Sequence, residues 1–275
     1  MSTQKYRHPI LFYSLSAGIP WILWSISGYL SHHENVTYAT SASCSILVIL
    51  GLIGPTLVAG FMFWAQKDLH ADLWNRLFSF NIVRPIYGIL TCCLIPASIL
   101  LAQFISLMFG YSIDQFQLAK AASFSSGLLP TWILLLLAPV LEELAWHSYG
   151  TDTLRARFSV FSTSIIFGVY WILWHVPLSF IKGYYQSNLV ELGLWHSISF
   201  AVSVIPFVLI MNWLYYKTNR NILVPILFHM SANISNEIFA THPDSKIIQT
   251  GLLLAFSVVL VWKKKRFFFT REFRD

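Results

Sequence analysis

Charged residues are scarce in this chain. Only 11% of its 275 residues are Asp, Glu, Lys or Arg, whereas ordinary soluble domains carry roughly 25%. Hydrophobic residues make up 56% of the chain and the mean hydropathy is +0.62, so a membrane protein is the first interpretation. The net charge of +6 comes from short clusters between apolar runs and forms no basic face, so no nucleic-acid partner is expected.

Cysteine is nearly absent as well. Cys44, Cys92 and Cys93 all lie in apolar segments, which is typical of small buried hydrophobic residues. They predict neither a disulfide framework nor a CxxC metal site. Alternation of period two is also missing from the apolar segments, and this disfavours a β-barrel.

The chain does contain about eight apolar segments of spanning length. Each approaches the ~20 residues that a helix needs to cross ~30 Å of hydrocarbon, and a helix satisfies its own backbone in lipid. We therefore predict an all-α, polytopic transmembrane helical bundle with about eight spans, forming a single integral membrane domain over residues 1–275. The segments are 10–30, 43–65, 85–108, 127–149, 160–181, 194–215, 222–240 and 246–262.

The basic residues are distributed unevenly between the loops. With eight spans, 15 of the 18 Lys and Arg fall on the side of the termini, and Lys120, Lys182 and Lys246 fall on the other. Basic loops stay on the cytoplasmic side of a membrane, so both termini are predicted to be cytoplasmic. We expect a multi-pass protein in contact with membrane lipids. The bias suits a bacterial plasma membrane, the expected location, and also the endoplasmic reticulum.

Ionisable residues interrupt the apolar segments at three places. The stretch LEELAWH puts Glu142 and Glu143 side by side and His147 one turn later. A charged group at mid-bilayer costs roughly 2.5–3.5 kcal/mol on insertion scales, so such residues are rare unless they are useful. Successive helix positions lie about 100° apart, so the two glutamates are expected to have different roles. Glu143 and His147 are four residues apart and share one helix face.

The other two interruptions carry histidines. FGVYWILWHVPLSF contains His175, and LVPILFHMSANISNEIF contains His229, Asn233 and Glu237 at intervals of four, which predicts one polar stripe on an apolar helix. A carboxylate with a histidine can activate water, and a histidine with an asparagine can donate hydrogen bonds to an oxyanion. The same side chains can also hold a metal ion.

Each of these residues has a structural alternative. A single histidine or asparagine in the membrane often serves as a hydrogen bonder between helices, and Glu143 with His147 can form a structural pair. Trp171 and Trp174 are interpreted as packing or interfacial aromatics, and His196 as interfacial. Proton-coupled transporters also use intramembrane Glu and His, but they often show inverted repeats and interrupted helices, and the sequence shows neither. The joint occurrence of the set in three segments favours a hydrolase.

The order and spacing of these motifs resemble the CPBP family of intramembrane proteases, named for CAAX proteases and bacteriocin-processing enzymes and also called the Abi family. The family pattern is EExxxR, then aromatic-xxx-His, then Hxxx(N/D), with each motif on its own transmembrane helix. This chain has EELAWH from Glu142, WILWH ending at His175, and HMSAN from His229 to Asn233. The match covers roughly residues 127–240, which are expected to be the catalytic core.

The resemblance implies a membrane-embedded endopeptidase similar to a type II CAAX prenyl protease. Its substrate would be a membrane-associated or lipidated (CAAX-type) protein, or a peptide precursor. The resemblance implies that Glu142 and His175 activate the attacking water. It implies that His229 and Asn233 stabilise the oxyanion. Glu143 would support the site, and two further supporting residues are expected, namely His147 and Glu237.

The resemblance leaves open whether the peptidase is of the glutamic or the metallo type. If a divalent metal such as Zn²⁺ is present, its expected ligands are Glu142, His175 and His229. The sequence does not require a metal and predicts no other cofactor.

The sequence departs from the family pattern at His147, where the motif has Arg. Arg is a permanent cation, whereas His is a cation only when protonated, and neighbouring carboxylates favour that form. We hypothesise that protonated His147 replaces the Arg, so activity should fall at alkaline pH. If the change is disabling, the protein is a non-catalytic relative that binds a partner, as an immunity protein does. Trp171 stands where Phe is common, which is a conservative change.

Overall fold

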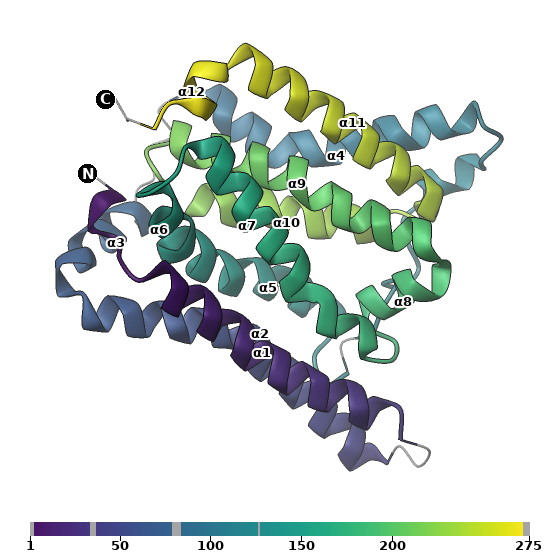
Figure 1. The fold of residues 1–275 in the computed structure, drawn as a ribbon. Helices are drawn as coiled ribbons and strands as arrows, with labels where there is room; N and C mark the ends of the chain where they lie inside the picture. Colours follow the sequence, from purple (N-terminus) through teal and green to yellow (C-terminus); the bar gives the residue numbers. More distant parts are fainter. Residues whose placement is uncertain (1–2, 34–36, 79–83, 126, 272–275) are drawn as a thin grey trace.

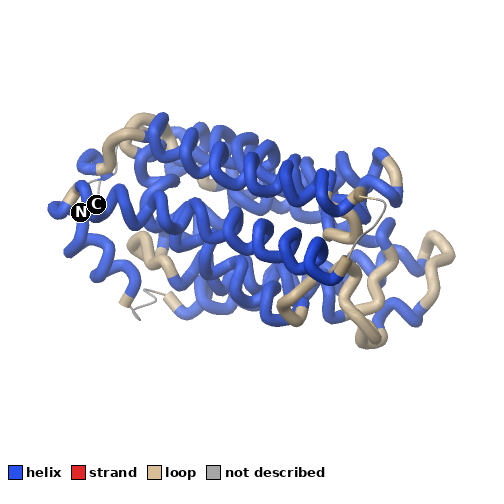
Figure 2. Tube along the Cα trace, turned by 90° about the horizontal axis from the view of Figure 1, so that it is seen from below, coloured by secondary structure: helices blue, strands red, loops and turns tan. Residues whose placement is uncertain are grey.

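The computed structural model describes residues 3–33, 37–78, 84–125 and 127–271. Arg274, counted above among the basic residues, lies outside these ranges. The chain within them is helical, and its β-type contact is an isolated antiparallel bridge between Leu118 and Phe239. The long helices form one bundle, and both ends of the described chain lie at the same end of it (Figures 1 and 2). The predicted all-α bundle is confirmed.

Each predicted apolar segment overlaps one long helix, and short helices lie between or after the long ones. The long helices are α1 (Pro9–Ser31), α2 (Tyr38–Ala65), α4 (Pro85–Leu107), α5 (Thr131–Ala145), α7 (Val160–His175), α9 (Leu194–Lys217), α10 (Leu223–Ile238) and α11 (Pro243–Lys263). The short helices are α3 (His70–Leu77), α6 (Thr151–Arg155), α8 (Tyr185–Leu192) and α12 (Lys265–Phe269), and the sequence predicts none of them except the extension that contains α6.

Six helices in the described part of the chain are long and apolar enough to cross a membrane. They are α1, α2, α4, α7 with the 3₁₀ turn after it (Val160–Phe180), α9 and α11. The two others, α5 and α10, have 15 and 16 residues, fewer than the ~20 that a span needs. α5 and α10 carry most of the candidate site residues. That they also cross the membrane, which would make eight spans, stays a prediction. The cytoplasmic placement of the termini also stays a prediction.

The helix that begins with α5 is longer than α5 itself. It continues through a π-helical turn (Trp146–Gly150) into α6 and ends at Arg155. The motif LRARF indicates such an extension past residue 150. A Cβ at Gly150 would lie 2.6 Å from the Phe12 ring, so a larger residue there would push α1 away.

The two short spanning candidates lie in the middle of the bundle. α5 packs against α2 and α10, and α10 also packs against α4 and α9 (Figure 1). The outer helices expose large apolar side chains, as a lipid-facing surface does. Examples of their exposed fractions are 67% for Leu57, 63% for Phe104 and 61% for Val258. The polar faces of α5 and α10 therefore meet inside the protein.

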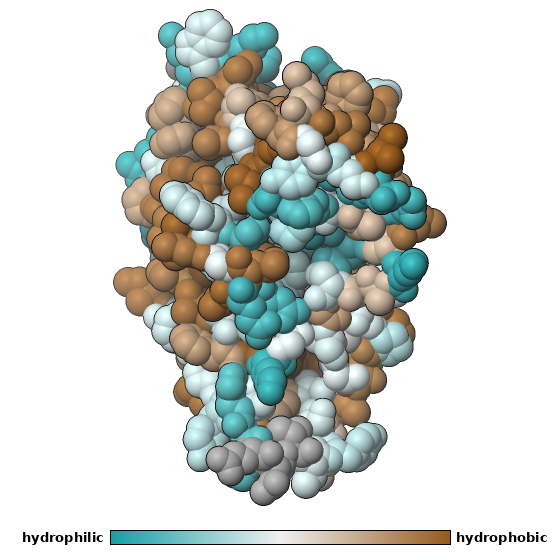
Figure 3. Space-filling view, turned by 90° about the vertical axis from the view of Figure 1, so that its right-hand side faces the viewer, coloured by the Kyte–Doolittle hydropathy of each residue, from teal (hydrophilic) through white to brown (hydrophobic). Residues whose placement is uncertain are grey.

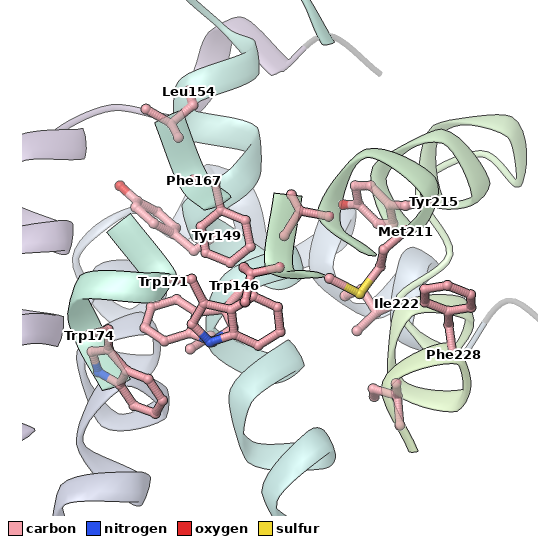
Figure 4. Packing of buried hydrophobic residues seen from close by; sticks show 14 of the residues in the cluster. Trp146, Tyr149, Leu154, Phe167, Trp171, Trp174, Met211, Tyr215, Ile222 and Phe228 are labelled. Carbon is pink, nitrogen blue, oxygen red and sulfur yellow. The ribbon is translucent and has the colours of Figure 1, made fainter. Parts of the chain in front are cut away.

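Aromatic side chains fill the space between the π-helical turn and α7 (Figure 4). The Trp146 ring centroid lies 5.8 Å from that of Phe167 and 5.5 Å from that of Trp174, and all three residues are fully or almost fully buried. Large rigid rings in contact hold neighbouring helices at a fixed spacing. This packing sets the position of α5 relative to α7, and these two helices carry the first two motifs.

Candidate active site

Glu142 on α5 is held by the second motif. Its Oε2 accepts a hydrogen bond from Trp171 Nε1 at 3.0 Å, and both side chains are buried. Trp171 is therefore a hydrogen-bond donor as well as the packing residue that the sequence predicted. One turn later on α7, His175 Nδ1 lies 2.7 Å from the Trp171 carbonyl oxygen. A carbonyl only accepts, so Nδ1 is the donor and Nε2 of the neutral ring is an acceptor.

Glu143 points in a different direction from Glu142, as the helical geometry predicts. It is fully buried, and its Oε1 lies 2.8 Å from His229 Nδ1 on α10. Its Oε2 bonds to Nδ1 of His147, which is four residues along the same helical run. One carboxylate thus joins the first motif to the third. The predicted pairing of Glu143 with His147 is present in the structure.

The other ring nitrogen of His147 has a partner, Asn212, that no motif in the sequence predicts. His147 Nε2 lies 2.9 Å from Asn212 Oδ1, and Asn212 is fully buried on α9. Asn212 Nδ2 donates to Ser164 Oγ at 2.9 Å, and Ser164 Oγ donates to the Val160 carbonyl oxygen at 2.8 Å. This chain orients the Asn212 amide with its oxygen toward His147. Both His147 nitrogens therefore face oxygen acceptors, an arrangement that a doubly protonated ring satisfies in full.

The predicted site residues from all three motifs share one cavity. It has a volume of about 360 Å³ and lies between α5, α7, α9 and α10, in the half of the bundle away from the termini. Much of the wall is aromatic, with Trp24, Phe200 and Phe207 among its residues. The predicted site residues that line the cavity are Glu142, His175, His229, Asn233 and Glu237. The end of the bundle opposite the termini carries a band of hydrophilic side chains (Figure 3).

Asn233 and Glu237 follow His229 along α10 as the predicted polar stripe. Asn233 Nδ2 donates to the Leu135 carbonyl oxygen of α5 at 3.3 Å. The Glu237 carboxylate accepts from Ser123 N at 2.7 Å and from Ser123 Oγ at 2.9 Å. The end of the stripe thus holds the segment that precedes α5. His196, expected to be interfacial, also lines the cavity.

The carbonyl groups of the π-helical turn are bonded from outside the helix. Such a turn shifts the hydrogen bonds from i→i+4 to i→i+5 and occurs often at functional sites. Arg76 on α3 donates to the Ser148 carbonyl oxygen at 2.8 Å and to that of His147 at 3.1 Å. The Tyr215 hydroxyl on α9 donates to the His147 carbonyl oxygen at 2.8 Å. These contacts fix the backbone of the residue that binds Glu143.

Arg76 belongs to a buried ionic cluster at the end of the bundle that holds the termini. Arg220 Nη2 lies 2.5 Å from Asp152 Oδ2 and 2.8 Å from Asp72 Oδ2, and Arg76 Nη1 lies 3.1 Å from Asp152 Oδ2. Burial raises the pKa of Asp72, but the guanidinium groups of Arg76 and Arg220 outweigh this effect and hold that pKa below its ordinary value. Both arginines count as loop charges in the predicted charge bias. The structure corrects this, because their exposed fractions are 4% and 8%.

The predicted metal ligands do not converge on one point. In the described residues, no group of three or more His, Cys, Asp or Glu side chains could hold a metal ion together. Glu142, His175 and His229 line the same cavity, but Glu142 Oε2 is bonded to Trp171 and His229 Nδ1 to Glu143. Because no such group is present among the described residues, no step proposed below passes through a metal ion.

The fold and the cavity together define a helical integral membrane protein with a buried polar site. The family profile described as type II CAAX prenyl endopeptidase, Rce1-like, matches residues 124–235. The chain is also 35% identical over 271 residues to "CAAX prenyl protease 2" of Methanococcus maripaludis, and the alignment covers 98% of each chain. The chain belongs to the family of Rce1-like type II CAAX prenyl endopeptidases. It is a membrane peptidase of that family, and the family resemblance drawn from the three motifs is confirmed. This relative comes from an archaeon, so a bacterial plasma membrane stays a prediction.

Proposed function

We propose that this chain is an intramembrane endopeptidase that cleaves a peptide bond near the C-terminus of a lipidated, CAAX-type protein. The name of the Methanococcus relative supports this substrate class. The observation that carries the proposal is the shared cavity, because Glu142, His175 and His229 come from three helices and line one buried space.

Glu142 and His175 activate the water in this proposal. Glu142 Oε2 already accepts a hydrogen bond from Trp171 Nε1, so Glu142 Oε1 is the oxygen that faces the water. His175 donates through Nδ1 to a backbone carbonyl, which leaves Nε2 as an acceptor that orients the same water. The water oxygen bonds to the substrate carbonyl carbon as its proton passes to Glu142. Glu142 then gives that proton to the leaving amine when the C–N bond breaks.

His229 and Asn233 stabilise the oxyanion that forms on the substrate carbonyl. Glu143 accepts from His229 Nδ1, and its negative charge favours a His229 that also carries a proton on Nε2. Asn233 uses one amide N–H on the Leu135 carbonyl oxygen, and its second N–H donates to the oxyanion. His147 balances the remaining charge of Glu143, in place of the Arg of the family pattern.

Glu142→Gln tests the proposal against a matched Glu→Gln change at Glu191, which is exposed on α8. The purified variants are incubated with a farnesylated CAAX peptide in detergent and EDTA, and the products are identified by mass spectrometry. Glu142→Gln should lower kcat by about 10²-fold or more, because the general base is lost, while Glu191→Gln should match wild type. Equal cleavage by Glu142→Gln would refute the assigned role. A wild-type protein that binds the peptide but cleaves nothing would indicate a non-catalytic relative.

A further inference from the structure

Lys246 is the one Lys or Arg among the described residues that line the cavity, although the chain has 18. It lies in the first turn of α11, and its side chain is 21% exposed. Its Nζ donates to the Asn236 carbonyl oxygen at 2.9 Å and lies 5.8 Å from the centroid of the Tyr185 ring. These contacts hold a single cation at the wall of an otherwise aromatic and acidic cavity.

The carboxylate nearest to this cation is occupied by other partners. Glu237 Oε1 is 3.9 Å from Lys246 Nζ, so the two groups form an ion pair but no hydrogen bond. Both Glu237 oxygens instead accept from Ser123, at 2.7 Å and 2.9 Å. An ammonium group has three N–H donors, and the bond to Asn236 uses one of them. Lys246 therefore retains the capacity to bind an anion that enters the cavity.

The position of Lys246 along α10 matches the length of a short peptide. Asn236, to which it bonds, follows His229 by seven residues, which is a rise of ~10 Å along the helix axis. A CAAX motif ends at the free C-terminus, so every bond inside it lies one to three residues from the terminal carboxylate. Three extended residues span ~10 Å. A scissile bond beside His229 thus places the carboxylate of a three-residue leaving peptide near Lys246.

We infer that Lys246 is the subsite for the free C-terminal carboxylate of the substrate. This inference rests on the proposed endopeptidase function. A carboxylate that enters a cavity with a largely aromatic wall loses part of its hydration, and a charge-assisted bond to an ammonium group compensates for that loss. An internal peptide segment has no carboxylate at this position. Lys246 therefore selects chain ends and makes the enzyme specific for the last residues of its substrate.

Two peptides that differ only at the last group test the subsite. One is a farnesylated CAAX peptide with a free carboxylate, and the other is the same peptide with a C-terminal amide. Wild type should cleave the acid with a kcat/KM about 10- to 100-fold above that of the amide, the range of a charge-assisted bond. Lys246→Gln retains a side-chain donor but no charge. It should cleave both peptides at about the wild-type rate for the amide.

Two further variants separate recognition from folding. Lys246→Arg keeps the cation and should keep most of the preference for the acid. Lys182→Gln removes an exposed lysine at the same end of the bundle and should behave as wild type. A wild-type protein that cleaves acid and amide equally would overturn the subsite. A Lys246→Gln variant that slows both peptides by the same factor would also overturn it, since that result indicates a structural role. Cleavage of neither peptide by wild type would refute the proposed function itself, and the subsite with it.

Discussion

Two adjacent tyrosines on α9 allow the π-helical turn to be tested. The Tyr215 hydroxyl donates to the His147 carbonyl oxygen in the turn at 2.8 Å. The Tyr216 hydroxyl donates to Asp152 Oδ1 at 3.1 Å in the ionic cluster. Both residues are buried. Tyr215→Phe and Tyr216→Phe therefore each remove a buried hydroxyl that contacts Asp152, but the first also removes a bond to the turn and an acceptor of Arg76.

The two changes should cost similar stability and different activity. Loss of a buried hydrogen bond costs about 1–3 kcal/mol when an acceptor is left unsatisfied. The His147 carbonyl oxygen keeps its bond from Arg76, and Asp152 Oδ2 keeps its bonds from Arg76 and Arg220. A cost near the lower limit, about 1 kcal/mol, is therefore expected for Tyr215→Phe. If that energy holds His147 and Glu143 in place during the reaction, its loss lowers kcat about fivefold. Tyr216→Phe should leave kcat unchanged.

The assay measures kcat and KM for a farnesylated CAAX peptide together with the unfolding temperature in detergent. Tyr215→Phe should lower kcat with little change in KM, because the turn holds the site rather than the substrate. Equal kcat in the two variants, with equal losses of stability, would refute the idea that bonds to the turn position the site.

Three further outcomes are expected. His147→Arg should remain active, because Arg restores the family pattern beside Glu143, whereas complete inactivity would contradict replacement of the family's Arg by His147. Since the pKa of Asp72 is lower in the folded than in the unfolded protein, its contribution to stability is present above the unfolded value near 4 and is lost as the pH falls further. The unfolding temperature of wild type should therefore drop more between pH 6 and pH 3 than that of Asp72→Asn, and parallel curves would contradict this. A cysteine placed at the exposed Lys182 should react with an impermeant thiol reagent added to intact cells, and protection there with labelling from the inside would reverse the predicted orientation.

The long helices were predictable because the length of an apolar run is a local property. The predicted segments 85–108 and 194–215 differ from α4 and α9 by no more than two residues at any end. The π-helical turn was not predictable. It depends on the close approach of Gly150 to Phe12 and on bonds from Arg76, and both partners are more than 70 residues away in the chain. The short helices α3, α8 and α12 escaped prediction because they have too few residues to show a period.

The sequence by itself determined the residue types of the site and their order. Two glutamates in a row, and a histidine four residues before an asparagine, are spacings that a helix converts directly into shared or separate faces. Only the tertiary structure decided which glutamate lines the cavity, that Trp171 donates to it, and that Asn212 completes the shell of His147. These are contacts between separate helices. A buried polar group needs a hydrogen-bond partner, and the packing of the helices decides which group that partner is. The spacing of residues within a single helix does not predict these partners.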